Sequence, residues 1–206
     1  MDCNRFCRES HRARWTELKI AGVANRRFTS IIFTETRLKG AFIIELEKHV
    51  DQRGFFARTY CEREFESYGL KSRYVQSSIS FNSRKGTLRG MHFQTTPYEE
   101  AKLIRCSRGA VYDVIIDLRN GSPTFKQHLA LVLSAENGRM LYVPESFAHG
   151  FQTLEDDTEV FYQMSQFYAP EHGRGIRWND PAFGIEWPEE ERIILERDQS
   201  YGDFAT

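Results

Sequence analysis

The sequence has no long apolar stretch. No run among its 206 residues approaches the roughly 20 apolar residues of a membrane-spanning helix. Its first residues also lack the apolar region of a secretory signal peptide. We therefore expect a soluble, cytoplasmic protein with reduced thiols, with no membrane partner. A chain of this length is most simply one domain, and it can bury a sizeable core without disulfide bonds.

Cysteine is also scarce, with only Cys3, Cys7, Cys61 and Cys106 in the chain. Cys3 and Cys7 form the one close pair, and no second pair follows, whereas a structural zinc site needs four ligands. No internal repeat or low-complexity tract is present. These absences argue against a zinc-binding domain and against a repeat architecture.

The chain carries little net charge, with a formal value of −1 at neutral pH. This near balance argues against a general role in nucleic-acid binding. Residues 1–30 are the exception, since seven Lys or Arg residues stand there against three acidic residues. Because no recognised binding motif accompanies these charges, we interpret residues 1–30 as a basic, poorly ordered extension and residues 31–206 as a single domain.

Short strand-like segments separated by turn residues make up most of the chain, and Cys61–Tyr68, which a glycine follows, is the best helix candidate outside residues 1–30. The segment after Trp178 is mostly irregular, with one short helix that we expect to lie over the rest of the domain. Regularly spaced strands with little helix indicate an all-β sandwich or barrel. The expected strands are Ala41–Lys48, Phe55–Tyr60, Ser72–Phe81, Thr87–Gln94, Lys102–Cys106, Ala110–Asp117, Gln127–Leu133, Arg139–Val143 and Glu159–Ser165.

Two stretches concentrate the residues that could carry chemistry. The first, Gly86–Gly109, holds Arg89, His92, Gln94 and Lys102. Alternation along its strand predicts that His92 and Gln94 point to one side, with Leu88, and that Arg89 points to the other. A single histidine on a strand is at least as often a core residue as a catalytic one. The second stretch, Gly138–Thr153, adds His149.

Together these stretches resemble the paired motifs of the cupin superfamily, which forms small antiparallel jelly-roll barrels. The matching residues are Gly86, His92 and Gly109 in the first motif and Gly138, Pro144 and His149 in the second. Gln94 and Lys102 replace a histidine and a glutamate that metal-binding cupins use as ligands. Because an ammonium group has no lone pair to donate, the sequence predicts no metal site.

Longer strings extend the resemblance to the dTDP-4-dehydrorhamnose 3,5-epimerase family, over roughly two thirds of the chain. This resemblance implies an epimerase that needs no cofactor. It would invert C3, C5 or both in a nucleoside-diphosphate-linked 4-keto-6-deoxyhexose, in deoxysugar or polysaccharide biosynthesis, with a dTDP-linked sugar as substrate. The strings are DQRGFF, GTLRGMHFQ, AKLIR, VYDVIIDLRNGSPTF, LSAEN, VPESFAHGFQTL, EVFYQ, FYAP, WNDPAFGIEWP and ERDQS.

The resemblance also assigns catalytic roles. His92 matches the general base, and an imidazole changes its charge near neutral pH. Asp198 matches the carboxylate beside this base, and nothing else in the sequence singles it out. Lys102 matches the cation near the enolate oxygen, where it would stabilise charge that develops in the transition state. Tyr162 matches the acid on the opposite face of the sugar, although its strand position is equally compatible with a core tyrosine.

Other matches concern substrate binding. Arg53 and Arg89 match residues for the diphosphate, to which a guanidinium group can donate two hydrogen bonds. Tyr168 matches an aromatic residue against the nucleotide base, and His149 matches a substrate hydrogen-bonding residue. Gln76 and Arg197 complete the expected set. The chain departs from the family pattern at several nearby positions, which are Ser77, Ser78, Arg58, Gly173 and Arg197 itself.

Three alternative functions are compatible with the same barrel fold. A sugar-nucleotide ketoisomerase would use similar enediol chemistry, and a metal-dependent cupin enzyme is disfavoured by Gln94 and Lys102. A non-catalytic sugar-nucleotide-binding protein would not need His92, Tyr162 and Asp198 together. The resemblance further implies a homodimer in which subunits exchange strands.

Overall fold

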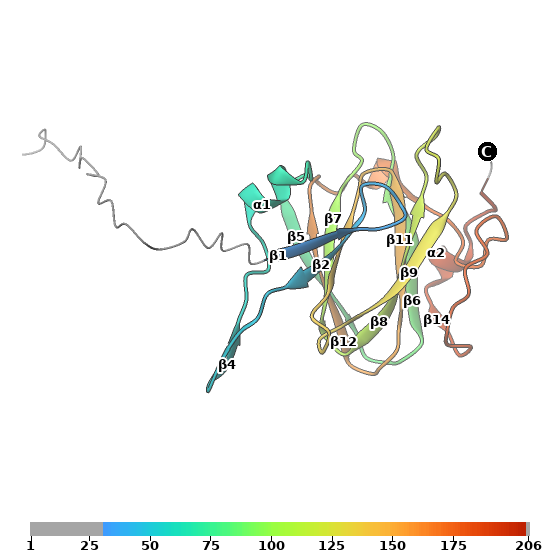
Figure 1. Ribbon diagram of the computed structural model, residues 1–206. Helices are drawn as coiled ribbons and strands as arrows, with labels where there is room; N and C mark the ends of the chain where they lie inside the picture. The colour runs from blue at the N-terminus through green and yellow to red at the C-terminus, as the bar shows by residue number, and fades with distance from the viewer. Residues whose placement is uncertain (1–30, 205–206) are drawn as a thin grey trace, which may run out of the picture.

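The computed structural model describes residues 31–204. The predicted basic extension, residues 1–30, lies outside this range. Two β-sheets face each other and a few short helical turns complete the fold (Figure 1), which confirms the all-β jelly-roll expectation. No helix among the described residues is long and apolar enough to span a membrane.

The first sheet has six strands in the order β1, β2, β10, β7, β12, β5, with antiparallel neighbours throughout. These strands are β1 (Ile31–Glu35), β2 (Phe42–Leu46), β10 (Met140–Val143), β7 (Lys102–Arg108), β12 (Thr158–Met164) and β5 (Gln76–Asn82).

The second sheet follows the order β13, β6, β11, β8, β9, and a short parallel strand, β14, pairs with β6. A separate hairpin of two short strands, β3 and β4, projects away from the two sheets (Figure 1). The strands are β13 (Gly173–Gly175), β6 (Thr87–Gln94), β11 (Phe147–Thr153), β8 (Ala110–Asp117), β9 (His128–Ser134), β14 (Ile193–Ile194), β3 (His49–Asp51) and β4 (Gly54–Phe56).

Three hydrophobic clusters hold these layers together. The central cluster draws residues from both sheets, including Ile104, Ile115 and Phe151, and so fills the space between them. A second cluster lies on the outer face of the first sheet, where Phe65 of helix α1 (Glu62–Ser67) is fully buried. Helix α1 confirms the helix expected near Cys61–Tyr68. Burial of such aromatic and aliphatic side chains contributes about 1.5–3 kcal/mol each.

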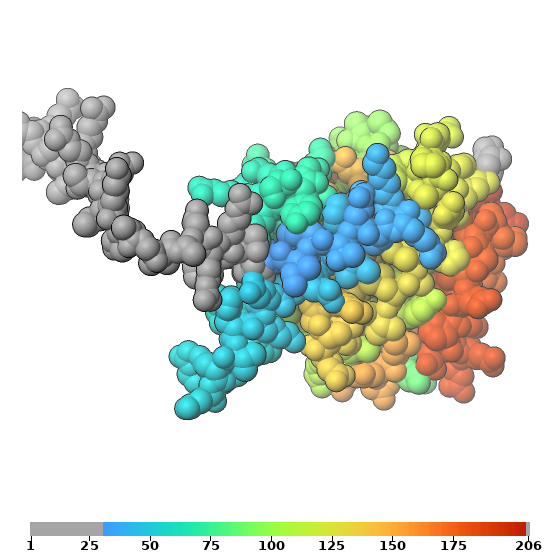
Figure 2. Space-filling view, viewed as in Figure 1, coloured from blue at the N-terminus to red at the C-terminus, as the bar shows by residue number. Residues whose placement is uncertain are grey.

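The third cluster lies on the outer face of the second sheet, under the C-terminal segment. Ile176, Phe183 and Trp187 of this segment pack there against Val114 and Ile116 of β8. Strand β8 is therefore covered on both faces, which explains its nearly continuous apolar sequence. The C-terminal segment forms a layer over this side of the domain (Figure 2), as expected, and includes helix α2 (Glu196–Gln199).

The expected strands are mostly present, with some changes in extent. β6 and β8 have the predicted bounds, whereas the strand expected over Phe55–Tyr60 covers only Gly54–Phe56. The sequence analysis missed β1 and β11 as strands. β11 was missed because its sequence, FAHGFQT, lacks a clean alternation, and it is buried on both faces.

The predicted alternation along β6 is wrong in one respect. His149 of β11 is opposite His92, and Phe151 is opposite Arg89. The pairing therefore advances three residues along β6 for two residues along β11, which is a β-bulge. This bulge shifts the side chains that follow it to the other face. As a result Arg89 and His92 line the same cavity, while Leu88 and Met91 both pack in the outer cluster.

Candidate active site

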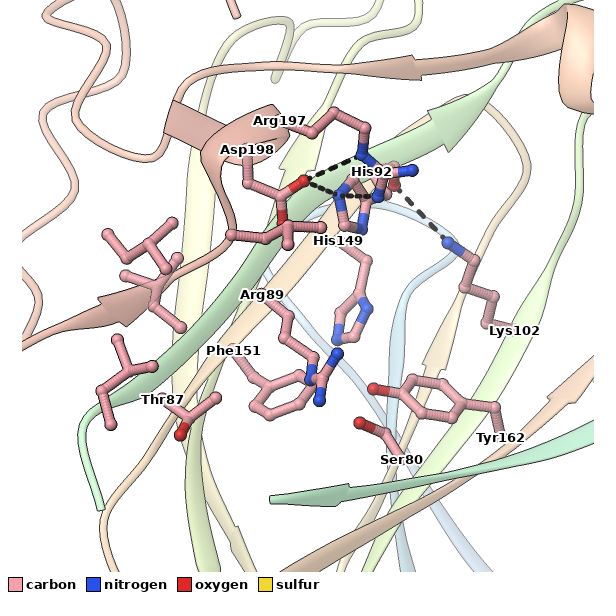
Figure 3. Close-up of a pocket in the computed structure, with 14 residues that line it drawn as sticks. Ser80, Thr87, Arg89, His92, Lys102, His149, Phe151, Tyr162, Arg197 and Asp198 are labelled. Carbon is pink, nitrogen blue, oxygen red and sulfur yellow. Dashed lines mark hydrogen bonds and ion pairs between the residues drawn. The ribbon is translucent and has the colours of Figure 1, made fainter. Parts of the chain in front are cut away.

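A cavity of about 510 Å³ opens between the two sheets (Figure 3). Its walls come from β6 and β11 of the second sheet, from β5, β7 and β12 of the first sheet, and from the C-terminal segment. The lining residues with polar side chains are Ser80, Thr87, Arg89, His92, Lys102, His149, Tyr162, Arg197 and Asp198.

His92 and Asp198 form a hydrogen-bonded pair on one wall of this cavity. The Nε2 atom of His92 lies 2.8 Å from Oδ1 of Asp198. Asp198 reaches this position because β14 pairs in parallel with the start of β6, through Ile193 and Thr87, which places α2 beside the strand. The carboxylate side chain is only 3% exposed, whereas the imidazole is 35% exposed.

The hydrogen bonds of Asp198 determine its charge. Burial opposes ionisation, but hydrogen bonds from His92, from the backbone N–H of Gly90 and from Arg197 keep the pKa of Asp198 below its ordinary value. An ionised carboxylate can only accept, so Nε2 of His92 carries a proton, and in the neutral imidazole the lone pair lies on Nδ1. His92 is thereby set to accept a proton at Nδ1.

Arg197 lies at the rim beside this pair. Its guanidinium contacts Oδ1 of Asp198 at 3.3 Å and Nε2 of His92 at 3.4 Å. Tyr201 also packs edge-on to His92, with ring centroids 6.3 Å apart. The predicted binding residue Arg197 is therefore at the cavity, in direct contact with the histidine.

Lys102 is held in a polar network at the edge of the cavity. Its Nζ atom lies 3.1 Å from Glu100 and 3.5 Å from the backbone oxygen of His92. Glu100 in turn accepts a hydrogen bond from Gln94, whose side chain also accepts from the backbone N–H of Ala169. Gln94, at the position of a cupin metal ligand, is thus a structural link between loops.

Tyr162 lies on β12, across the cavity from His92 on β6 (Figure 3). Its ring packs against the central cluster. Burial raises the pKa of Tyr162 well above the ordinary value, as does the nearby charge of Asp113, while the positive charge of Arg89 opposes the increase. The phenol is therefore protonated and can donate a proton into the cavity.

His149 forms a second histidine–carboxylate pair deeper in the protein. Its Nε2 atom lies 2.9 Å from Oδ2 of Asp113 on β8, and the two side chains are 5% and 0% exposed. The sequence analysis did not single out Asp113. The available signal was an acidic residue inside the apolar run of β8, because a buried carboxylate needs a partner.

Arg89 is oriented by Asn82, another residue that the sequence analysis missed. The Nε atom of Arg89 donates to Oδ1 of Asn82 at 2.7 Å. Asn82 is itself fixed, since its amide donates to the backbone oxygens of Ser80 and Thr158. This leaves the terminal nitrogens of Arg89 free to bind an anion in the cavity.

Three predicted binding residues do not line the cavity. Arg53 lies in the turn of the β3–β4 hairpin, is paired with Asp51, and has a side chain that is 89% exposed. Gln76 accepts a hydrogen bond from the backbone N–H of Tyr168, which fixes the loop after β12. Tyr168 is exposed. Burial lowers the pKa of Arg197, but Tyr201 and Asp198, with a smaller effect of Tyr168, raise it above its ordinary value.

The sequence of the domain is similar to that of known proteins. The model of the dTDP-4-dehydrorhamnose 3,5-epimerase family matches residues 35–206. The dTDP-4-dehydrorhamnose 3,5-epimerase of Sinorhizobium fredii is 42% identical over 174 residues, which cover 84% of this chain and 87% of the relative.

Two solved structures show the same likeness in three dimensions. The dTDP-4-dehydrorhamnose 3,5-epimerase of Bacillus anthracis, with TDP and PPi bound, superposes with a TM-score of 0.82 at 40% identity, covering 84% of this chain and 99% of that one. The dTDP-6-deoxy-D-glucose-3,5-epimerase of Legionella pneumophila, in complex with dTDP-4-keto-L-rhamnose, gives 0.77 at 36% identity, covering 82% and 89%. The chain belongs to the dTDP-4-dehydrorhamnose 3,5-epimerase family.

Proposed function

We propose that this protein epimerises a nucleoside-diphosphate-linked 4-keto-6-deoxyhexose at C3, C5 or both, without a cofactor. The observation that carries the proposal is the placement of His92 and Tyr162 on opposite sheets, facing each other across one cavity. Inversion at carbon needs a base on one face and an acid on the other. Hydrogens next to the C4 ketone are acidic enough to be removed because the resulting anion is an enolate.

The reaction begins with proton removal by His92. Its Nδ1 lone pair takes the proton from carbon, and Asp198 stabilises the imidazolium that forms. The ammonium of Lys102 stabilises the negative charge that develops on O4. Tyr162 then donates its phenolic proton to the carbon from the other side, which inverts the centre.

A dTDP group is the nucleotide part that we propose for the substrate. The B. anthracis relative binds TDP and the L. pneumophila relative binds a dTDP-linked keto sugar, which supports this choice. Arg89 and Arg197 provide positive charge at the cavity for the diphosphate. Tyr168 offers an exposed ring for stacking against the base, with Gln76 fixing its backbone.

Arg53 supports a further proposal, that the protein works as a homodimer. The hairpin that carries it also exposes Val50 and Phe56, at 76% and 74%. Apolar side chains exposed together on a projecting hairpin are typical of a protein–protein contact. A second copy that receives this hairpin would place Arg53 near a diphosphate. Sedimentation analysis tests the dimer, and a Phe56→Ser variant should dissociate it.

A cytoplasmic location is also proposed. Both described cysteines, Cys61 and Cys106, are free thiols, which suits a reducing compartment.

Proton exchange in D2O tests the proposed activity. The protein is incubated with dTDP-4-keto-6-deoxyglucose and with other nucleotide-linked 4-keto sugars, and NMR follows deuterium at C3 and C5 and the configuration of the product. We expect exchange and inversion with at least one of them, and loss of both in His92→Ala, with His128→Ala on β9 as control. A product with a moved carbonyl would indicate a ketoisomerase instead, and binding without exchange would contradict the proposal.

A further inference from the structure

The buried pair of His149 and Asp113 has no role in the proposed proton transfers. Asp113 uses Oδ2 to accept from His149, and its other oxygen, Oδ1, is buried without a hydrogen-bond partner among residues 31–204. A carboxylate in this environment is costly unless a positive charge lies beside it. Asp113 therefore provides a buried carboxylate in direct contact with the ring of His149.

His149 is also the neighbour of Tyr162. The two rings are 6.0 Å apart between centroids and inclined at 73°, and both side chains line the cavity (Figure 3). Because Nε2 of His149 is engaged by Asp113, Nδ1 is the atom left to interact with the cavity side. One water molecule is enough to connect such neighbouring groups by hydrogen bonds.

Each inversion leaves the two reacting groups in the wrong protonation states. His92 ends as an imidazolium and Tyr162 as a tyrosinate. The side chain of His92 is 35% exposed, so its extra proton can pass to solvent. Tyr162 is partly buried where it packs against the central cluster, and a sugar bound in the cavity would lie between its hydroxyl and bulk water.

Few groups near Tyr162 can return its proton. The guanidinium of Arg89 keeps its protons at any physiological pH, and the hydroxyl of Ser80 is too weak an acid. Lys102 is paired with Glu100 and is assigned to the enolate oxygen. An imidazole gains and loses a proton near neutral pH, which leaves His149 as the donor.

We propose that the His149–Asp113 pair reprotonates Tyr162 between inversions, so that His149 acts through Tyr162 and not on the sugar. This inference rests on the proposed epimerase function. In the step, the Nδ1–H bond of the His149 imidazolium breaks and an O–H bond forms on the Tyr162 oxygen, directly or through one water. A tyrosinate and an imidazolium become a neutral phenol and a neutral imidazole. His149 regains its proton from water when the product leaves.

The test compares the first inversion with later ones in His149→Gln. Tyr162 is protonated in the resting protein, so the first inversion does not need the relay. With enzyme in excess, we expect the first inversion within about 3-fold of the unmodified protein. With substrate in excess, we expect a burst of one inversion per site and then a rate lower by about 100-fold, the loss typical of a missing proton donor. Absorbance of tyrosinate in the near ultraviolet should rise during the slow phase.

Asp113→Asn should show the same burst, since it removes the counter-charge of the imidazolium with little change in shape. His128→Gln on β9 serves as a matched control and should show no burst, and thermal melting verifies that each variant is folded. Equal losses in the first and later inversions in both variants would overturn the relay, because a binding or structural role predicts that result. An unchanged steady-state rate would overturn it too. Absence of inversion by the unmodified protein would instead overturn the proposed function, and the relay with it.

Discussion

His92 and Asp198 are 106 positions apart in the chain, yet Nε2 of one lies 2.8 Å from Oδ1 of the other. This contact selects the tautomer in which Nδ1 of His92 can accept a proton. Replacing Asp198 by Asn removes the charge and offers an amide donor to Nε2. We expect kcat to fall by about 100-fold or more, since the histidine is then held in the wrong tautomer, with little change in KM. The exposed residue Asp203 provides the control, Asp203→Asn. If kcat of this control variant fell by the same factor, the loss in Asp198→Asn would not be explained by the tautomer of His92.

Tyr162→Phe separates the two halves of the reaction. The variant keeps the ring that packs against the central cluster but has no proton to donate. Exchange of carbon-bound hydrogen in D2O should continue through His92, while inversion should slow by about 100-fold. NMR measures both in one sample. Tyr112→Phe, on the outer face of β8, should affect neither, and equal loss of exchange and inversion in Tyr162→Phe would contradict the acid role.

Lys102→Gln tests the stabilisation of the enolate. Because the charge on O4 appears mainly in the transition state, we expect kcat to fall by about 100- to 1,000-fold while KM changes little. The surface ion pair of Lys85 and Glu189, at 3.0 Å, provides the matched control Lys85→Gln. A rise in KM with an unchanged kcat would show that Lys102 only binds the substrate.

Arg89→Lys tests the recognition of the diphosphate. A lysine cannot keep the Asn82 contact and also present two further donors, so one or more charged hydrogen bonds are lost. Such bonds contribute about 1.5–3 kcal/mol each, which predicts a rise in KM of about 10-fold or more. Steady-state kinetics measures this, with exposed Arg84→Lys as control. An effect confined to kcat would place Arg89 at the reacting carbons.

Asp117 links stability to pH. It is the last residue of β8, is fully buried, and accepts hydrogen bonds from Arg119, Ser122 and Thr124. Burial alone would raise its pKa, but these bonds hold the pKa well below the ordinary value. Its stabilisation is therefore complete above the unfolded-state pKa of about 3.9 and is lost as the pH falls below it.

The variant Asp117→Asn should be less stable at neutral pH by about 2–3 kcal/mol. Because it has no carboxylate to protonate, its melting temperature should fall less on acidification than that of the unmodified protein. Thermal melts from neutral to acid pH measure the difference. Parallel curves for the two proteins would show that other groups dominate the acid response.

The sequence predicts the barrel well because most strands alternate or are continuously apolar between clear turns. Family motifs in the sequence also point to four residues that the structure places at the cavity, His92, Lys102, Tyr162 and His149. Arg89 was assigned to the wrong side of β6, because a bulge depends on pairing with β11 and leaves no local pattern.

Other parts of the site depend on contacts between distant segments. Asp198 lies in a short polar helix whose position is fixed by β14 and β6, so only family resemblance pointed to it. Asp113 and Asn82 act on other side chains and have no motif of their own. Arg53 lies outside the cavity of its own chain, in an exposed pair with Asp51.

The parallel pairing of β14 with β6 also has a consequence during synthesis. Except for β14, the strands of both main sheets lie before residue 176, so most of the barrel can assemble before Asp198 leaves the ribosome. Until then His92 lacks the carboxylate that orients it. A chain cut short before Ile193 would lack Asp198, so His92 would have no carboxylate partner. The site for proton transfer is thus complete only when β14 has paired with β6 and has brought Asp198 to His92.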